Sequence, residues 1–253
     1  MTASDPHRFA DGDDLVVFWI KKYHDASIDD YINKIYGYRI QDAATRTDAV
    51  NFQEVSEYLA EGDDLGMIST DWDPDINVNT ARIAWTKKEG GNYNTYAARV
   101  TFHPETNQPD GVAQRYKIFD GTRDALNPKI VVNHNNPQGE MKEAFCSFTS
   151  DNKFKRVDLE VIDGVDYWQT PVNVIDDDIS DQEANITYRE FGNPRHIWIN
   201  QGIHTESEKI ENGGIAAKLC TNRDNKRDIY SAYRWERERP PQYNMVIIRQ
   251  LEP

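Results

Sequence analysis

The sequence predicts an α+β protein with a β-sandwich-like core of antiparallel strands and a few helices. Short runs rich in β-branched and aromatic residues recur along most of the chain, and such runs are typical of strands. Asp-Gly, Asn-Pro and Gly-Gly pairs, which favour turns, separate them at short spacing. Two segments instead carry apolar residues three and four positions apart, which predicts helices. No internal repeat and no Gly/Ser linker divides the chain, so we expect a single domain over residues 1–253.

The first strands are predicted at 14–27 and 31–40. The first segment, "DLVVFWIKKYHDAS", begins as a continuous apolar run and ends in charged residues. The second, "YINKIYGYRI", alternates large apolar with polar side chains, so the two favour a hairpin. Further strands are predicted at 77–88, 95–104, 112–121, 128–134, 143–150, 155–170, 185–192, 195–204 and 243–250.

The helices are predicted near 48–61 and near 213–238. In the first segment Phe52, Val55 and Leu59 recur at helical spacing, and Asn51 and Glu54 have the spacing of a capping box. The second segment has apolar residues at helical spacing before two prolines, which predicts one broken helix or two short ones.

The chain is strongly acidic and rich in aromatic residues. It has 43 acidic against 29 basic residues, a net charge of -14. This balance disfavours a phosphate backbone as partner, and the densest basic stretch, 223–239, alternates bases with acids. We therefore expect no sequence-specific nucleic-acid partner. With 13 Tyr, 9 Phe and 6 Trp, the chain should fold and has residues suited to contact surfaces.

The cysteines and the N-terminal region predict an intracellular protein. Cys146 and Cys220 show no zinc-type or CxxC spacing, which fits a reducing compartment. The first residues lack the charged and apolar regions of a signal peptide, and no apolar run is long enough to span a membrane. We expect neither secretion nor membrane insertion.

A pair of histidines and two acidic segments are candidate metal-binding sites, but neither kind has the complete set of ligands at the required spacing. His196 and His204 lie in "HIWINQGIH", but an extended run and a glycine separate them, so structural or contact roles are the simpler interpretation. The segments 75–79 and 174–183 resemble calcium loops but lack the glycine and terminal glutamate at the required offsets. We expect no dedicated metal site, and incidental cation binding at 174–183 stays open.

Enzymatic motifs are missing from the sequence. It contains no G-x-S-x-G, P-loop, G-x-G-x-x-G or HExxH motif. An acid-pair hydrolase stays open, because so many carboxylates make some close pair almost inevitable. Cys146 and Cys220 are in apolar or helix-like contexts, where an inert buried thiol is expected.

A series of segments resembles the polyhedrins of cypoviruses. The strongest local likenesses are "FQEVSEYLAEG" at 52–62, "QGIHT" at 201–205 and "YRWERE" at 233–238, and the collinear order extends over about 14–240. The resemblance also includes "VVFWIKKYHDAS", "YGYRI" and "AARVTFHPETN".

This resemblance implies a structural role. Polyhedrins pack as trimers into crystals that enclose virus particles in the cytoplasm of the infected host cell. Familiar members carry a longer N-terminal arm that clasps neighbouring trimers, whereas only about a dozen residues precede the first predicted strand here. Some members bind nucleotides at lattice sites, so a bound nucleotide is allowed, but no residue is assigned to it and no cofactor is required.

The function expected from these observations is controlled self-assembly without catalysis. Aromatic anchors would supply cohesion, and the titration of 13 tyrosines and 13 lysines at alkaline pH would dissolve the crystal. The expected partners are other copies of the chain and virus particles. The alternatives are a lectin-like β-sandwich that binds carbohydrate and, third, an acid-pair glycoside hydrolase. The expected assembly contacts are Trp19, Tyr23, Tyr58, His204, Tyr233 and Trp235.

Overall fold

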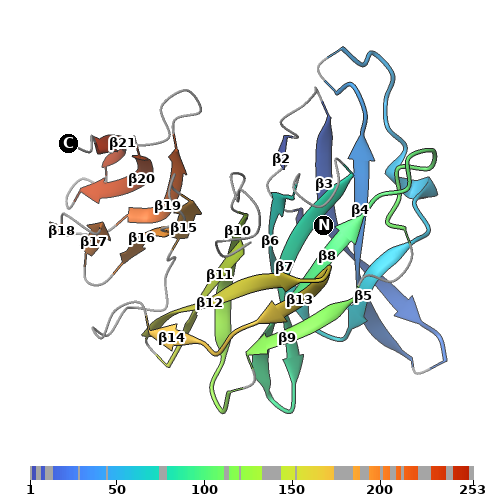
Figure 1. Cartoon of the computed structure of the whole chain (residues 1–253), viewed down its shortest axis with the longest axis horizontal. Coiled ribbons are helices and arrows are strands. Elements are labelled where there is room, and N and C mark those ends of the chain that lie inside the picture. Colours follow the sequence, from blue (N-terminus) through green and yellow to red (C-terminus); the bar gives the residue numbers. More distant parts are fainter. Residues whose placement is uncertain are drawn as a thin grey trace. The chain divides into compact units, whose positions relative to one another are not determined.

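The protein is built mainly of antiparallel β-sheets, as the computed structural model in Figure 1 shows. The structure describes residues 2–3, 7–8, 14–27, 29–43, 45–73, 79–110, 114–119, 121–132, 144–151 and 153–173. It also describes, as backbone strands, residues 185–188, 194–199, 202–205, 209–211, 214–221, 229–237 and 242–250. The chain divides into two compact units, Met1–His134 and Asn135–Pro253. The single domain over 1–253 stays a prediction.

Two sheets form most of the first unit. The first contains β3 (Leu15–Asp25), β4 (Asp30–Ile40) and β5 (Tyr58–Gly62), with the short β1 (Thr2–Ala3) and β2 (His7–Arg8) paired to β3. The second is a meander of β6 (Leu65–Trp72), β7 (Thr80–Glu89), β8 (Asn92–Thr101) and β9 (Arg115–Phe119). Strand β10 (Ala125–Val132) follows them in the chain.

The second unit contains three groups of strands. Strands β11 (Ala144–Ser150), β12 (Lys153–Ile162) and β13 (Val165–Trp168) are antiparallel in sequence order, and β14 (Val172–Asn173) also pairs with β12. A second sheet consists of β15 (Asn185–Tyr188), β16 (Pro194–Ile199), β17 (Gly202–Thr205) and β18 (Lys209–Glu211). A third consists of β19 (Gly214–Thr221), β20 (Ile229–Arg237) and β21 (Gln242–Gln250).

The predicted turn chemistry closes two of the hairpins. Gly90 and Gly91 join β7 to β8 with φ of 61° and 96°, and Asp163 and Gly164 join β12 to β13 with φ of 51° and 78°. Positive φ at both central residues gives the hairpin turn that matches strand twist. The predicted strand at 155–170 is therefore two strands of a hairpin.

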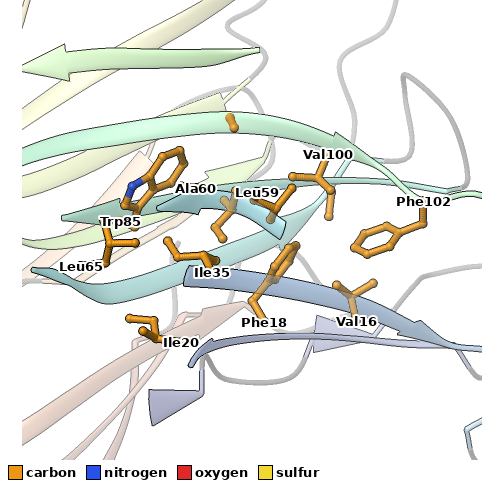
Figure 2. Packing of buried hydrophobic residues seen from close by; sticks show 13 residues of the cluster. Val16, Phe18, Ile20, Ile35, Leu59, Ala60, Leu65, Trp85, Val100 and Phe102 are labelled. Carbon is orange, nitrogen blue, oxygen red and sulfur yellow. The ribbon is translucent and has the colours of Figure 1, made fainter. Parts of the chain in front are cut away.

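The main core of the first unit lies between its two sheets. Alternate residues of β3 (Val16, Phe18 and Ile20) are buried with residues of β4, β5, β6, β7 and β8. Figure 2 shows these side chains pointing into the space between the strands. The ring of Phe18 lies 5.9 Å from that of Phe102, centroid to centroid. The two sheets thus stabilise each other by burying one apolar cluster.

The predicted helix at 48–61 is wrong. The segment contains one turn of 3-10 helix, Phe52–Glu54, and then strand β5. Asn51 and Glu54 are in contact, because the side-chain amide of Asn51 donates to the carboxylate of Glu54 at 2.8 Å. This bond joins two side chains, whereas a capping box joins each side chain to a backbone N–H. The next N–H groups, of Ser56 and Glu57, donate to the side-chain oxygen of Gln108, so they make no helical bonds. Pairing with β4 then holds the segment as a strand.

The predicted C-terminal helices near 213–238 are also wrong. Residues 214–221 and 229–237 are β19 and β20, and β20 pairs with β19 on one side and with β21 on the other. The β-branched and aromatic residues that repeat at helical spacing here also fit a strand. Pairing along both edges of β20 gives its backbone N–H and C=O groups hydrogen-bond partners, as the bonds within a helix would. No α-helix occurs in the described residues.

The sequence analysis missed strand β6 and the short strands β1, β2, β14 and β18. Strand β6 lacks a clear alternation of apolar and polar residues, and its pairing with β7 is irregular between Gly66 and Ser69.

Within the part of the chain that the structure describes, no helix has the length and apolar character needed to cross a membrane.

Candidate functional site

The outer face of the β3–β4–β5 sheet gathers aromatic and lysine side chains. Because strand residues alternate between faces, β3 turns Trp19, Lys21 and Tyr23 away from the core that holds Phe18. The pairing places Trp19 opposite Tyr36 and Lys21 opposite Lys34. Strand β5 adds Tyr58 opposite Tyr36 and Glu61 opposite Lys34. We call this surface the tyrosine–lysine face and define it by Trp19, Lys21, Tyr23, Lys34, Tyr36 and Tyr58.

Tyr36 is the centre of the face. Its ring stacks on Trp19 at 5.7 Å between centroids and lies 6.3 Å from the ring of Tyr58. Phe52, in the 3-10 turn, meets Trp19 edge-on at 5.1 Å. Trp19 and Tyr36 are buried together with Val55, so the 3-10 segment partly covers an aromatic cluster that is separate from the main core.

The two lysines of the face lie directly opposite each other. Like charges at such positions destabilise a sheet, and three neighbours offset this repulsion. The Lys21 ammonium is 4.9 Å from the centre of the Tyr23 ring, and Lys34 is 4.2 Å from that of Tyr58. Lys34 also lies 3.6 Å from a carboxylate oxygen of Glu61. Cation–π contacts and one ion pair therefore hold the two ammonium groups among the phenol rings.

The hydroxyl groups of Tyr23 and Tyr36 share a hydrogen bond of 2.6 Å. Burial raises the pKa of Tyr23, but its hydrogen bonds with Tyr36 and Lys21, together with the charges of Lys21 and Lys34, leave that pKa below 10.0. The pKa of Tyr36 is raised well above its usual range by burial and then by the bond to Tyr23 and by the charges of Tyr23 and Tyr58. The two phenols thus titrate as a unit, in which one ionises early and the other late.

The stability of the first unit should fall in alkaline solution because of Tyr36. The pKa of Tyr36 in the folded chain lies above the usual value for tyrosine, so the unfolded chain releases this proton first as the pH rises. The free energy of unfolding should therefore be insensitive to this group below about pH 10 and decrease above it. Tyr36→Phe should flatten the decrease in urea unfolding at a series of alkaline pH values. Tyr31→Phe, at an exposed tyrosine outside the face, should keep the wild-type slope; equal slopes for both variants would contradict the assignment.

The expected contact residues fall in two parts of the chain. Trp19, Tyr23 and Tyr58 all surround Tyr36, and Trp19 is buried against it. His204 lies in β17 opposite Trp198, and Tyr233 and Trp235 lie in β20; their side chains are outside the described residues. The sequence analysis missed Tyr36 and Lys34, although the alternation of "YINKIYGYRI" puts both on one face. The role of these residues in assembly stays a prediction.

The candidate metal segments lie largely outside the described residues. This holds for 174–183, for most of 75–79 and for the side chains of His196 and His204, which are on the neighbouring strands β16 and β17. In the described part of the chain, no three His, Cys, Asp or Glu side chains form a group that could hold a metal ion.

Asp71 and Asp73 of the first unit are buried in structural contacts. Asp71 accepts a hydrogen bond of 2.7 Å from the backbone N–H of Val132 in β10. A carboxylate oxygen of Asp73 lies 2.5 Å from Nε of Arg82, and both side chains are 0% exposed. These carboxylates bind parts of the first unit to one another and are shielded from solvent.

Cys146 is a free thiol buried in β11. Burial raises its pKa far above the usual value, so almost no thiolate forms near neutral pH. This agrees with the expected inert thiol. The side chain of Cys220 is outside the described residues.

Comparisons with known proteins add little to this geometry. No model of a known protein family matches the sequence, and no curated protein matches it. Among solved structures, the chain is similar to the catalytic domain of the GH62 α-L-arabinofuranosidase of Coprinopsis cinerea. The TM-score is 0.41 at 10% sequence identity, over 98% of this chain and 90% of that one. A score this low assigns neither a fold nor an activity to this chain.

Proposed function

We propose that this chain is a structural protein that assembles with copies of itself and is released from the assembly at alkaline pH. The form expected from the sequence resemblance is an occlusion-body protein of the cypovirus polyhedrin kind. Trimers would pack into crystals around virus particles in the cytoplasm of the infected cell, and no catalysis would be performed. A β-sandwich-like core is part of the proposal, supported by the apolar cluster that the two sheets of the first unit share.

The observation that carries the proposal is the tyrosine–lysine face. Two phenols share one hydrogen bond beside two lysines that lie opposite each other. At neutral pH the ammonium groups are held by the phenol rings and by Glu61. As the pH rises past about 10, tyrosines gain negative charge while lysines lose positive charge. On this face Tyr23 ionises before Tyr36. Once the lysines lose their charge, their attraction to the phenol rings is lost and the Tyr23 phenolate adds negative charge to a chain that already carries a net charge of -14.

The test is the size of the particles as a function of pH. Light scattering and sedimentation of the purified chain should show large assemblies at neutral pH that dissociate as the pH approaches about 11. Tyr23→Phe/Tyr36→Phe should move the dissociation to higher pH, because the phenol of the pair that ionises early is gone together with its partner. The matched control, Tyr31→Phe, should dissociate at the wild-type pH.

Two results would contradict the proposal. Assemblies that dissolve in acid but stay intact in alkali would exclude release by phenol and amine titration. A chain that is monomeric at neutral pH over the whole accessible concentration range would exclude self-assembly, and binding of that monomer to a carbohydrate array would favour the lectin-like alternative.

A further inference from the structure

Residues 52–57 close over part of the tyrosine–lysine face, and we call this segment the cover. The ring of Phe52 meets that of Trp19 edge-on at 5.1 Å between centroids. Val55 is buried together with Trp19 and Tyr36, and Tyr36 is only 5% exposed. The two apolar side chains of the cover thus help to keep water from the ring at the centre of the face.

The cover is held at its C-terminal end by the side chain of Gln108. The side-chain oxygen of Gln108 accepts hydrogen bonds from the backbone N–H groups of Ser56 and Glu57, at 3.0 and 3.2 Å. The next residue, Tyr58, begins strand β5, so Gln108 fixes the point at which the cover joins the sheet. A single 3-10 turn supplies few bonds of its own, and the cover therefore depends on this side chain for its position.

The loop that carries Gln108 is itself firmly placed. The backbone C=O of Gln108 accepts a hydrogen bond from the N–H of His103 at 2.9 Å, and the N–H of Asn107 donates to the C=O of His103 at 2.9 Å. The C=O of Asn107 accepts from the N–H of Arg39 in β4 at 3.0 Å. The loop is thus closed on itself and bonded to the strand at the centre of the face. Gln108 connects the cover to that strand.

We propose that Gln108 is a positioning residue of the tyrosine–lysine face, which holds the cover closed over Trp19 and Tyr36. It thereby sets how alkaline the solution must become before the assembly is released. This inference rests on the proposed release at alkaline pH and identifies a contact that regulates it.

An open cover should make Tyr36 ionise more readily. Burial is the largest of the causes that raise the pKa of Tyr36, so access of water to this phenol should let it ionise at a lower pH. The titratable groups on the elements packed around Tyr36 are Lys21, Tyr23, Lys34, Tyr38, Tyr58, Glu61, Glu54 and Glu57. Glu54 and Glu57 belong to the cover, and movement of these negative charges away from the phenol favours its ionisation further. A second phenolate would then form beside that of Tyr23 within the pH range of release.

Gln108→Met tests the inference, because it removes the acceptor and keeps the length of the side chain. Amide hydrogen exchange at Ser56 and Glu57, in dilute neutral solution, should become on the order of tenfold faster. Alkaline titration followed by tyrosinate absorbance should show one phenol ionising about one pH unit lower than in the wild type. This change should be absent from Gln108→Met/Tyr36→Phe. The assemblies of Gln108→Met should dissociate at a lower pH than those of the wild type.

Three further variants separate the lost bond from a general loss of stability. Gln108→Glu keeps an acceptor oxygen on a side chain of the same length, so it should behave like the wild type. Gln108→Asn, whose oxygen is one methylene short of the two N–H groups, should behave like Gln108→Met. Gln114→Met, the same substitution at an exposed glutamine before β9, should change nothing. Amide exchange within β7 should stay at the wild-type rate in all of them.

Two results would overturn the role of Gln108. One is wild-type exchange at Ser56 and Glu57 in Gln108→Met and Gln108→Asn. The other is faster exchange that leaves both the ionisation of Tyr36 and the pH of dissociation unchanged. Self-assembly and alkaline release would be unaffected by either result. If the wild-type chain does not assemble, the proposed function falls, whereas exchange and the titration of Tyr36 still decide whether Gln108 holds the cover.

Discussion

Arg82→Ala should lower the free energy of unfolding by about 3–5 kcal/mol, the range for a buried ion pair that loses one partner. Nε of Arg82 lies 2.5 Å from a carboxylate oxygen of Asp73, and neither side chain has contact with solvent. Without the guanidinium, Asp73 must stay charged in a poorly solvated place or take up a proton, and either outcome destabilises the folded state. Urea unfolding followed by tryptophan fluorescence measures the effect.

Arg115→Ala is the matched control for this change. Arg115 is in β9 of the same sheet, with an exposed side chain, so its removal should change the free energy of unfolding by no more than about 0.5 kcal/mol. If Arg82→Ala and Arg115→Ala lower the free energy of unfolding by similar amounts, then the loss comes from removing a positive charge from the sheet. The buried Arg82–Asp73 pair would then make no special contribution to stability. Such a result would contradict the role given to Asp73.

Phe18→Ala should cost about 3–5 kcal/mol, as is typical when a buried aromatic ring leaves a cavity. Phe18 is fully buried between the two sheets of the first unit. Its ring lies over Gly37, where a Cβ atom would come within 2.6 Å of the ring. Because glycine has no side chain to fill the space, the cavity should persist. Thermal and urea unfolding should both report the loss.

Phe52→Ala provides the comparison for Phe18. Phe52 belongs to the aromatic cluster on the opposite face of the sheet and is 37% exposed, so its removal should cost clearly less than that of Phe18. Equal costs would show that the main core does not lie between the two sheets.

Phe18 and Trp19 are neighbours in β3, so loss of Phe18 should also loosen the tyrosine–lysine face and lower the pH at which assemblies dissociate.

Local sequence patterns predicted the structure correctly where residues close together in the chain decide its conformation. The alternation in 31–40 and the apolar run in 14–27 predict the first hairpin, and the pairing of Leu15 with Ile40 confirms it. The pairs Gly90-Gly91 and Asp163-Gly164 predict turns because they tolerate positive φ, and both close hairpins. Tyr23 and Tyr58 were recognised as candidate contact residues, but their meeting at Tyr36 depends on the register of three strands.

What the sequence by itself determined is the strand-rich composition, the turns and the acidic, tyrosine-rich surface chemistry, because each depends on residues that are near one another in the chain. Only the tertiary structure decided the state of residues 52–62, where helical spacing predicts one conformation and pairing with β4 produces another. Gln108, 51 positions from Glu57, binds the N–H groups that a helix would need. The same long-range pairing sets Lys21 opposite Lys34, and a contact between residues far apart in the chain has no local pattern that predicts it.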